Sequence, residues 1–205
     1  KYAPGTCGHE WVGIVSAAGS EVQNVSEGDR VTGALAPGCG RCQECRSGMS
    51  QYCKKSWSEY AGSSGPTSGG FAPFLKVTAE RVIKIPDRID VRDAALIEPA
   101  AVAFHAVRRS NIRIGDVVCV VGAGAIGLLT AQCARAAGAG LVIAVDPDES
   151  RRELGLTLGL DRAVAPGEEL NQMLSEVNGG LKADLAFDCA GIPQTMQQSV
   201  DMVRR

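Results

Sequence analysis

The sequence has no marked excess of charge of either sign. Its 21 Lys and Arg residues face 23 Asp and Glu residues, which gives a formal net charge of −2, and no long basic run occurs. Proteins that bind the phosphate backbone of nucleic acids carry a basic patch or stripe. The charge balance therefore argues against nucleic acid as a partner, and with it against a nucleic-acid-binding zinc ribbon.

Long apolar runs are also absent. No stretch of 18 or more apolar residues occurs, and the first residues show neither an apolar signal core nor an Arg-rich transit pattern. We therefore expect a soluble, cytoplasmic protein with no membrane partner. What the chain does have is length: 205 residues, 45% of them apolar, suffice for a sizeable core in one large or two small domains.

Two patterns of apolar residues divide the chain. Short β-like runs broken by Gly, Pro, Ser and Asp occupy residues 11–15, 29–35, 71–77 and 81–86, and a helical pattern interrupted near Pro99 follows over residues 93–110. Predicted strands at 117–122, 141–146, 162–166 and 183–188 then alternate with predicted helices at 125–138, 149–159, 168–178 and 193–205. The alternation predicts a parallel sheet of about four strands with right-handed crossovers. We expect an α/β protein with a β-rich domain at 1–107 and a dinucleotide-binding domain at 108–205.

Four of the eight cysteines are concentrated in one short segment. Cys39, Cys42 and Cys45 follow at intervals of three, and Cys53 comes eight residues later. Four thiolates can close a tetrahedral shell around zinc and leave no open position, which is the arrangement of a structural site. Four basic residues surround it: Arg41, Arg46, Lys54 and Lys55. Two disulfides or four free thiols are the alternatives, and a reducing compartment favours the metal.

A glycine-rich turn lies between the first predicted strand and the first predicted helix of the second half. Gly122, Gly124 and Gly127 form G-x-G-x-x-G. The first glycine permits a tight turn, the second lets the backbone approach a pyrophosphate, and the third allows close helix packing. The pyrophosphate would bind at the helix N-terminus, where the N–H groups around Ala125 and Ile126 are unpaired. A turn that binds no ligand is the alternative.

An acidic residue ends the next predicted strand. Asp146 lies about 20 residues after the glycines, where a carboxylate accepts hydrogen bonds from the adenosine ribose hydroxyls and repels a 2′-phosphate. This favours NAD over NADP. Arg151 and Arg152 weaken the distinction, because downstream arginines can hold a 2′-phosphate, although they could equally stack on adenine or face solvent.

Several isolated residues are candidates for a second metal site. His9 and Glu10 are adjacent, and spacing alone fits a metal site or a hydrogen-bonded structural pair. Glu98 lies in an apolar stretch, where a buried carboxylate must be paired or metal-bound, but it could also simply begin a helix. We predict a structural role for His105, on an Ala- and Val-rich helical face. Cys7 could in principle reach a metal at His9.

The order of these motifs resembles one family over essentially the whole chain. GHEWVGIV, EGDRV, the four-cysteine segment, GGFAPF, ALIEPAAVAFHAVRR, VVGAGAIG and the VD at Asp146 resemble the zinc-containing medium-chain dehydrogenase/reductases. The resemblance implies a GroES-like catalytic domain joined to a Rossmann domain, with a hydride passed between an alcohol and a nicotinamide. It also implies that His9 and Glu10 contribute to a catalytic zinc. Pro73 and Ala100 depart from the family pattern without touching the metal ligands.

The resemblance further implies a substrate class. Glu98 lies where ethanol-type members have a cysteine and where polyol, butanediol and threonine dehydrogenases have a glutamate, so we expect a secondary alcohol, polyol, diol or hydroxy-amino acid as substrate. A first zinc-ligand cysteine would lie before Lys1 and the last Rossmann strands beyond Arg205, so both domains would be incomplete here. We expect a homo-oligomer for the intact enzyme. The alternative is a truncated, non-catalytic fragment that binds zinc and nucleotide.

Overall fold

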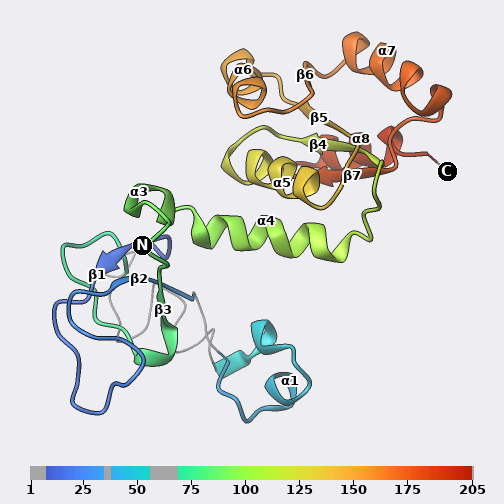
Figure 1. Ribbon diagram of the computed structural model, residues 1–205. Helices are drawn as coiled ribbons and strands as arrows, with labels where there is room; N and C mark the ends of the chain where they lie inside the picture. Colours follow the sequence, from blue (N-terminus) through green and yellow to red (C-terminus); the bar gives the residue numbers. More distant parts are fainter. Residues whose placement is uncertain (1–7, 35–37, 56–68, 205) are drawn as a thin grey trace. The chain divides into compact units, whose positions relative to one another are not determined.

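The chain forms two compact units, Lys1–Glu98 and Pro99–Arg205 (Figure 1). The computed structural model describes residues 8–34, 38–55 and 69–204. Our sequence-based boundary, after residue 107, assigned helix α4 (Ile97–Arg109) to the first domain instead. The structure places most of this helix in the second unit because Val107 is buried in the core of that unit.

The first unit contains a three-stranded antiparallel sheet. The register pairs Gly13 with Val31 and Thr32 with Ile83. The order is β1-β2-β3, with β1 at Gly13–Ile14, β2 at Arg30–Gly33 and β3 at Val82–Lys84. A 3₁₀ helix, η2 (Ala79–Arg81), precedes β3, and helix α3 (Val91–Ala94) follows it. Asp90 caps α3 because its side chain accepts the N–H of Arg92 at 2.8 Å. The predicted β-rich character of this half is confirmed.

The expected strand at 71–77 is wrong. Leu75 and Val77 are half-buried and alternate with exposed Phe74 and Lys76, as in a strand, but residues 72–77 form no hydrogen bond within the part of the chain that the structure describes. Alternation specifies which side chains face inward, whereas a strand also needs a ladder partner.

The four cysteines lie in a separate small lobe, residues 38–55. Two short helices form it, α1 (Gln43–Arg46) and the 3₁₀ helix η1 (Ser50–Tyr52). Among the described residues of the lobe, Cys53 alone is buried, and it is fully buried. The lobe therefore has almost no apolar core of its own.

The second unit is built on a four-stranded parallel sheet, as predicted. The strand order is β6-β5-β4-β7. The strands are β4 (Val117–Val121), β5 (Leu141–Val145), β6 (Arg162–Val164) and β7 (Leu185–Asp188). All five residues of β4 are buried, which explains its uninterrupted apolar sequence. The order reverses between β4 and β7, as in dinucleotide-binding sheets, and ligands bind in the crevice at that point.

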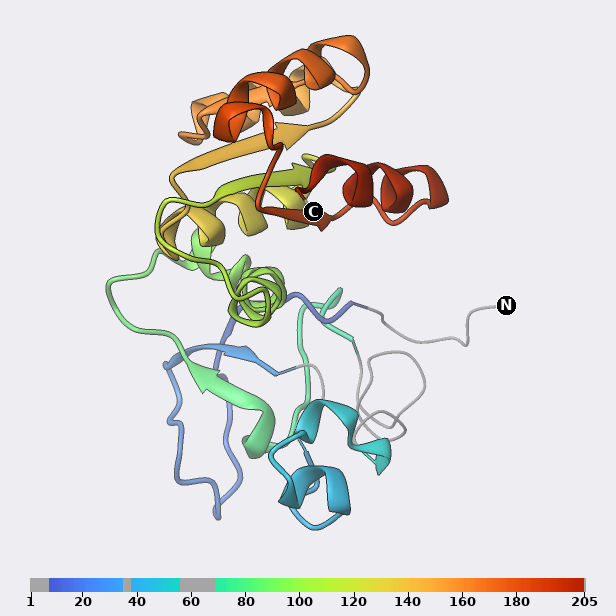
Figure 2. The same cartoon turned by 90° about the vertical axis from the view of Figure 1, so that its right-hand side faces the viewer.

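Helices cover both faces of this sheet (Figure 2). Helices α4, α5 (Ala125–Ala136) and α6 (Glu149–Thr157) pack on one face, over the cluster around Val118, Val120 and Leu128. Helices α7 (Glu168–Glu176) and α8 (Pro193–Met202) pack on the other, with the 3₁₀ helix η3 (Val177–Gly180) after α7. No helix among the described residues is both long and apolar enough to cross a bilayer.

The expected interruption near Pro99 is wrong. Helix α4 begins at Ile97 and runs through Pro99 without a break. Proline is tolerated in the first turn because an N–H at that position has no acceptor within the helix. The proline thus marks the start of the helix, and Glu98 lies in its first turn.

Candidate metal and dinucleotide sites

The four cysteines of the lobe converge. One sulfur from each of Cys39, Cys42, Cys45 and Cys53 lies within 4.8 Å of all the others. The Sγ atoms of Cys42 and Cys45 are 3.4 Å apart, and the N–H of Cys39 donates to Sγ of Cys53 at 3.4 Å. A tetrahedral zinc with Zn–S bonds of about 2.3 Å needs sulfurs about 3.8 Å apart. The donor set fits a closed, structural zinc site, and all four cysteines are free thiols rather than disulfides.

The surroundings of these thiols shift their pKa values in opposite directions. The N–H groups of Arg41 and Cys42 lower the pKa of Cys39. The N–H of Cys45 acts in the same direction on Cys42, but burial and the neighbouring Cys45, Glu44 and Cys39 side chains outweigh it and raise the pKa of Cys42 to about 12. Thiolates this close cannot all be charged unless a cation compensates them.

A second group of metal donors lies in the first unit. His9, Glu10 and Glu98 each offer one donor atom within 4.8 Å of the other two. Nε2 of His9 and Oε1 of Glu98 are 3.8 Å apart, and their side chains are 45% and 15% exposed. Three nitrogen and oxygen donors leave coordination positions open, which is the arrangement of catalytic zinc sites. The residues at 9–10 come from the segment before β1, and Glu98 comes from the first turn of α4.

His105, for which we predicted a structural role, lies later on α4, is exposed and is not part of this group. Cys7 lies outside the described residues.

The backbone before His9 is held by residues to which the sequence analysis assigned no contact. Gly8 has φ +94°, and a Cβ there would lie 2.8 Å from the ring of Phe71. The N–H of Gly70 donates to the carbonyl of Gly8 at 2.9 Å. Phe71 is 71% exposed although it packs against this glycine. A glycine pair followed by an aromatic residue is the sequence signal that could have identified this contact.

The glycine-rich turn leads from β4 into α5 as predicted. Gly122 has φ +94°, which favours glycine. A Cβ at Gly127 would lie 1.8 Å from the carbonyl oxygen of Gly122, so only glycine allows α5 to approach the turn this closely. Gly124 begins the helix with nothing within 4 Å of where its Cβ would be.

The first turn of α5 offers unpaired donors. The N–H groups of Ala125, Ile126 and Gly127 have no acceptor within the described part of the chain. Together with the positive end of the helix dipole they form a suitable site for a pyrophosphate.

Asp146 follows β5 and is 2% exposed. Its Oδ2 accepts the N–H of Ala123 at 2.7 Å, and its Oδ1 accepts the N–H of Asp148 at 2.9 Å. The carboxylate thus ties the end of β5 to the glycine turn. Nη1 of Arg151 lies 3.6 Å from Oδ2, and Arg152 donates to the carbonyl of Asp146 at 2.9 Å. The carboxylate oxygens keep lone pairs for ribose hydroxyls, while the half-exposed Arg151 adds positive charge beside them.

The loop after β7 is a part of this site that the sequence analysis missed. A Cβ at Gly122 would lie 3.0 Å from the backbone nitrogen of Ala190. Asp188 organises the loop because it accepts the N–H groups of Ala190 and Gly191, each at 3.0 Å. Partial burial opposes ionisation, but these two N–H groups lower the pKa of Asp188 overall. The pattern of alternating strands and helices predicts a parallel sheet but not that β7 lies beside β4.

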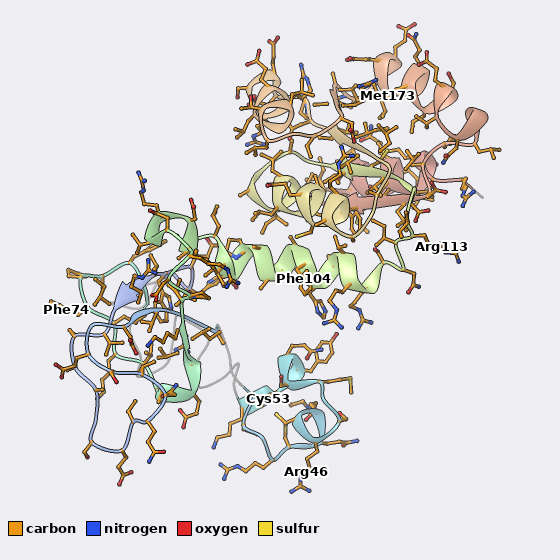
Figure 3. All side chains as sticks on the ribbon, viewed as in Figure 1. Arg46, Cys53, Phe74, Phe104, Arg113 and Met173 are labelled. Carbon is orange, nitrogen blue, oxygen red and sulfur yellow. The ribbon has the colours of Figure 1, made fainter. Side chains whose placement is uncertain are left out.

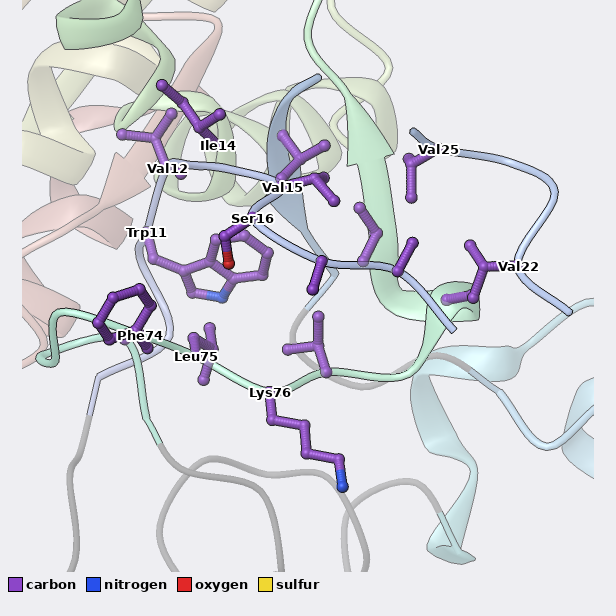
Figure 4. Close-up of a pocket in the computed structure, with 18 of the residues that line it drawn as sticks. Trp11, Val12, Ile14, Val15, Ser16, Val22, Val25, Phe74, Leu75 and Lys76 are labelled. Atoms are coloured by element: carbon purple, nitrogen blue, oxygen red, sulfur yellow. The ribbon is translucent and has the colours of Figure 1, made fainter. Parts of the chain in front are cut away.

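A groove of about 380 Å³ also lies in the first unit (Figure 4). Trp11 and Val15 line it from the segment around β1, and Leu75 lines it from the unpaired extended segment. Among the residues that the structure describes, its lining contains no His, Cys, Asp or Glu and one charged residue, Lys76. This described lining therefore offers no donor set for a metal and no acid–base pair.

Two family models match the chain. Residues 1–87 match the alcohol dehydrogenase GroES-like domain, and residues 125–205 match the zinc-binding dehydrogenase domain. Among curated relatives, L-idonate 5-dehydrogenase of Vitis vinifera is 35% identical over 98% of this chain and 56% of its own length. Sorbitol dehydrogenase of Halalkalibacterium halodurans is 34% identical over 99% of this chain and 59% of its own length.

Solved structures agree with the fold. A Sinorhizobium meliloti protein described as a zinc-binding dehydrogenase, with NADP bound, has a TM-score of 0.89 at 34% identity over 99% of this chain and 59% of its own. The 2R,3R-butanediol dehydrogenase of Bacillus subtilis has a TM-score of 0.83 at 32% identity, over 100% of this chain and 57% of its own. The predicted fold class, a GroES-like domain plus a Rossmann sheet, is confirmed. The chain spans little more than half the length of these relatives.

Proposed function

Because this chain belongs to the zinc-containing medium-chain dehydrogenase family, we propose that the intact protein transfers a hydride between a secondary alcohol, polyol or diol and NAD(H). The observation that carries the proposal is the convergence of His9, Glu10 and Glu98, in a chain that also presents unpaired donors after a glycine turn. The whole protein would be an enzyme that acts on small molecules, and we propose the cytoplasm as its location and a homo-oligomer as its assembly.

The proposed metal roles follow from the two donor sets. Cys39, Cys42, Cys45 and Cys53 would hold a structural zinc, and His9, Glu10 and Glu98 would contribute to a catalytic zinc. Bound zinc of the second kind lowers the pKa of a substrate hydroxyl, and an alkoxide is a better hydride donor than an alcohol. Glu98 supplies a carboxylate at the position where ethanol-type family members have a cysteine. A polyol or hydroxy-acid substrate is in accordance with the names of the relatives, a sorbitol and an L-idonate dehydrogenase.

Metal content is the direct test of the second donor set. We expect about two zinc ions per purified chain, one of which is lost on dialysis against a mild chelator. Glu98→Gln should lower the content to about one, because the least exposed of the three donors is weakened, whereas Glu21→Gln, on an exposed turn, should leave it unchanged. Elemental analysis of the three proteins measures this. One zinc in the unchanged chain would contradict the assignment of His9, Glu10 and Glu98 and favour a non-catalytic zinc- and nucleotide-binding fragment.

Cofactor choice is the second test. For NAD, the proposed pyrophosphate donors are at Gly122, Gly124, Gly127, Ala125 and Ile126, and the proposed ribose partners are Asp146 and Arg151. Asp146→Ala should weaken NADH binding roughly tenfold, because the acceptor for the ribose hydroxyls is lost. The variant should also bind NADPH better relative to NADH, because the charge that repels a 2′-phosphate is lost. Asp146→Asn, which keeps an oxygen for the N–H of Ala123, separates loss of charge from loss of that hydrogen bond. Fluorescence titration gives both affinities, and unchanged selectivity in both variants would remove Asp146 from the ribose site.

A further inference from the structure

We propose that the four-cysteine lobe is an oxidation switch: a small anionic disulfide converts Cys42 and Cys45 into an intrachain disulfide and releases the metal. The inference rests on the structural zinc of the proposed function and adds a regulated property to it. The remaining two lobe cysteines, Cys39 and Cys53, play no part in the bond.

Geometry selects the pair. The Sγ atoms of Cys42 and Cys45 are 3.4 Å apart, so a movement of little more than 1 Å brings them to a bond length of about 2.05 Å. Two residues separate them, the spacing at which reactive dithiols occur. Cys39 and Cys42 share this spacing, so it is the 3.4 Å contact that selects Cys42 and Cys45. Both are half-buried and accessible in part, whereas Cys53 is fully buried and accepts the N–H of Cys39. A reagent in solution therefore reaches Cys42 and Cys45 before it reaches Cys53.

Release of the metal should change the conformation of the lobe. Neither α1 nor η1 contains a buried residue, and Cys53 is the one buried member described in residues 38–55. A segment with so little apolar burial depends on its metal for order. Two cysteines would then remain as ligands, too few to hold zinc in a closed tetrahedral site. Oxidation of one pair is thus sufficient to unfold the lobe.

Charge selects the oxidant. Arg41 and Arg46 flank the pair and are exposed, Lys54 is exposed nearby, and Glu44 is the one acidic residue of the lobe. Figure 3 shows the Arg46 side chain on the outside of the lobe. A positive field concentrates anions, so a negatively charged disulfide such as oxidised glutathione should react faster than a neutral one.

The reaction balances without any other reagent. The thiolate of one cysteine attacks the oxidant, forms a mixed disulfide and expels one small thiolate. The thiolate of the other cysteine then attacks the protein sulfur of the mixed disulfide and expels the second. Two protein thiolates are oxidised, one small disulfide is reduced to two thiolates, and zinc is released.

Trypsin provides a sharp readout, because it cleaves after Arg41 and Arg46 and so isolates a pentapeptide that contains Cys42 and Cys45 and no other cysteine. The chain is first dialysed against a mild chelator, so that it keeps only the zinc of the lobe, and is then treated with oxidised glutathione. Zinc release is followed with a chromogenic chelator, and the remaining thiols are alkylated before digestion. We expect about one zinc to be released per chain. Over the same time the pentapeptide should change from the doubly alkylated form to an unalkylated form whose mass is two hydrogens below that of the free dithiol peptide. Dithiothreitol with added zinc should reverse both changes.

Two variants test the parts of the inference separately. Cys133→Ser, outside the lobe, should release zinc as the unchanged chain does. Arg46→Gln should slow release by oxidised glutathione roughly threefold and leave the rate with neutral 2-hydroxyethyl disulfide unchanged. Retained zinc, or a pentapeptide that stays alkylated while zinc is lost, would overturn the switch alone. A lobe without zinc before oxidation would overturn both the switch and the structural-zinc assignment.

Discussion

Replacing Gly127 with alanine is expected to abolish dinucleotide binding and to destabilise the second unit. The added Cβ would lie 1.8 Å from the carbonyl oxygen and 2.9 Å from the carbonyl carbon of Gly122. Both are backbone atoms, so α5 must move away from the turn, and its free N–H groups move with it. We expect a loss of about 3 kcal/mol, the upper end for overpacking, and a melting temperature lower by roughly 10 °C or more.

Two other glycines are matched controls. Gly124→Ala meets nothing within 4 Å at φ −73°, so it should keep the melting temperature but weaken NADH binding at least tenfold, because its methyl group takes the space of a pyrophosphate. Gly155→Ala meets only leucine side chains, at 3.3 Å and beyond, inside α6, and should change neither property appreciably. Thermal melting and NADH titration measure both effects. Unaltered NADH affinity in Gly127→Ala would contradict the placement of the cofactor at this turn.

Replacing Cys53 with serine is expected to remove the structural zinc and unfold the lobe. Cys53 is fully buried, and a hydroxyl is a poor substitute for a thiolate ligand of zinc. Because the lobe has so little other burial, loss of the metal is loss of its folding free energy. We expect about one zinc fewer per chain and at least tenfold faster tryptic cleavage after Arg46 and Lys54.

The control for this variant is another cysteine. Cys133→Ser changes a half-buried thiol on α5 that lies outside both metal groups, and should retain the zinc and the protease resistance of the lobe. Elemental analysis and timed proteolysis distinguish the variants. If Cys53→Ser kept its zinc and its resistance, the lobe would be held by something other than four thiolates.

Residues close together in sequence allowed the more secure predictions. The spacing of Cys39, Cys42, Cys45 and Cys53 is local, and so is the turn at Gly122–Gly127. The ligand chemistry of thiolates and the steric demands of a tight strand-to-helix turn act over a few residues. The structure accordingly brings the four sulfurs together and places the turn between β4 and α5.

Contacts between distant segments needed the tertiary structure. His9 and Glu98 are 89 positions apart, and no local property of either residue indicates that they meet. The same holds for the ring of Phe71 against Gly8, and for the loop after β7 beside Gly122.

The sequence by itself determined the α/β class with its parallel sheet, the four-cysteine segment and the glycine turn, because periodicity and spacing are local consequences of backbone geometry. Only the tertiary structure decided that α4 runs unbroken through Pro99 and that residues 72–77 have no ladder partner in the described chain. His9, Glu10 and Glu98 were candidates for one metal site from the sequence, and the tertiary structure brings them together. Strand pairing and ligand convergence depend on which distant segments pack together. That choice is made by the whole folded unit rather than by any single segment.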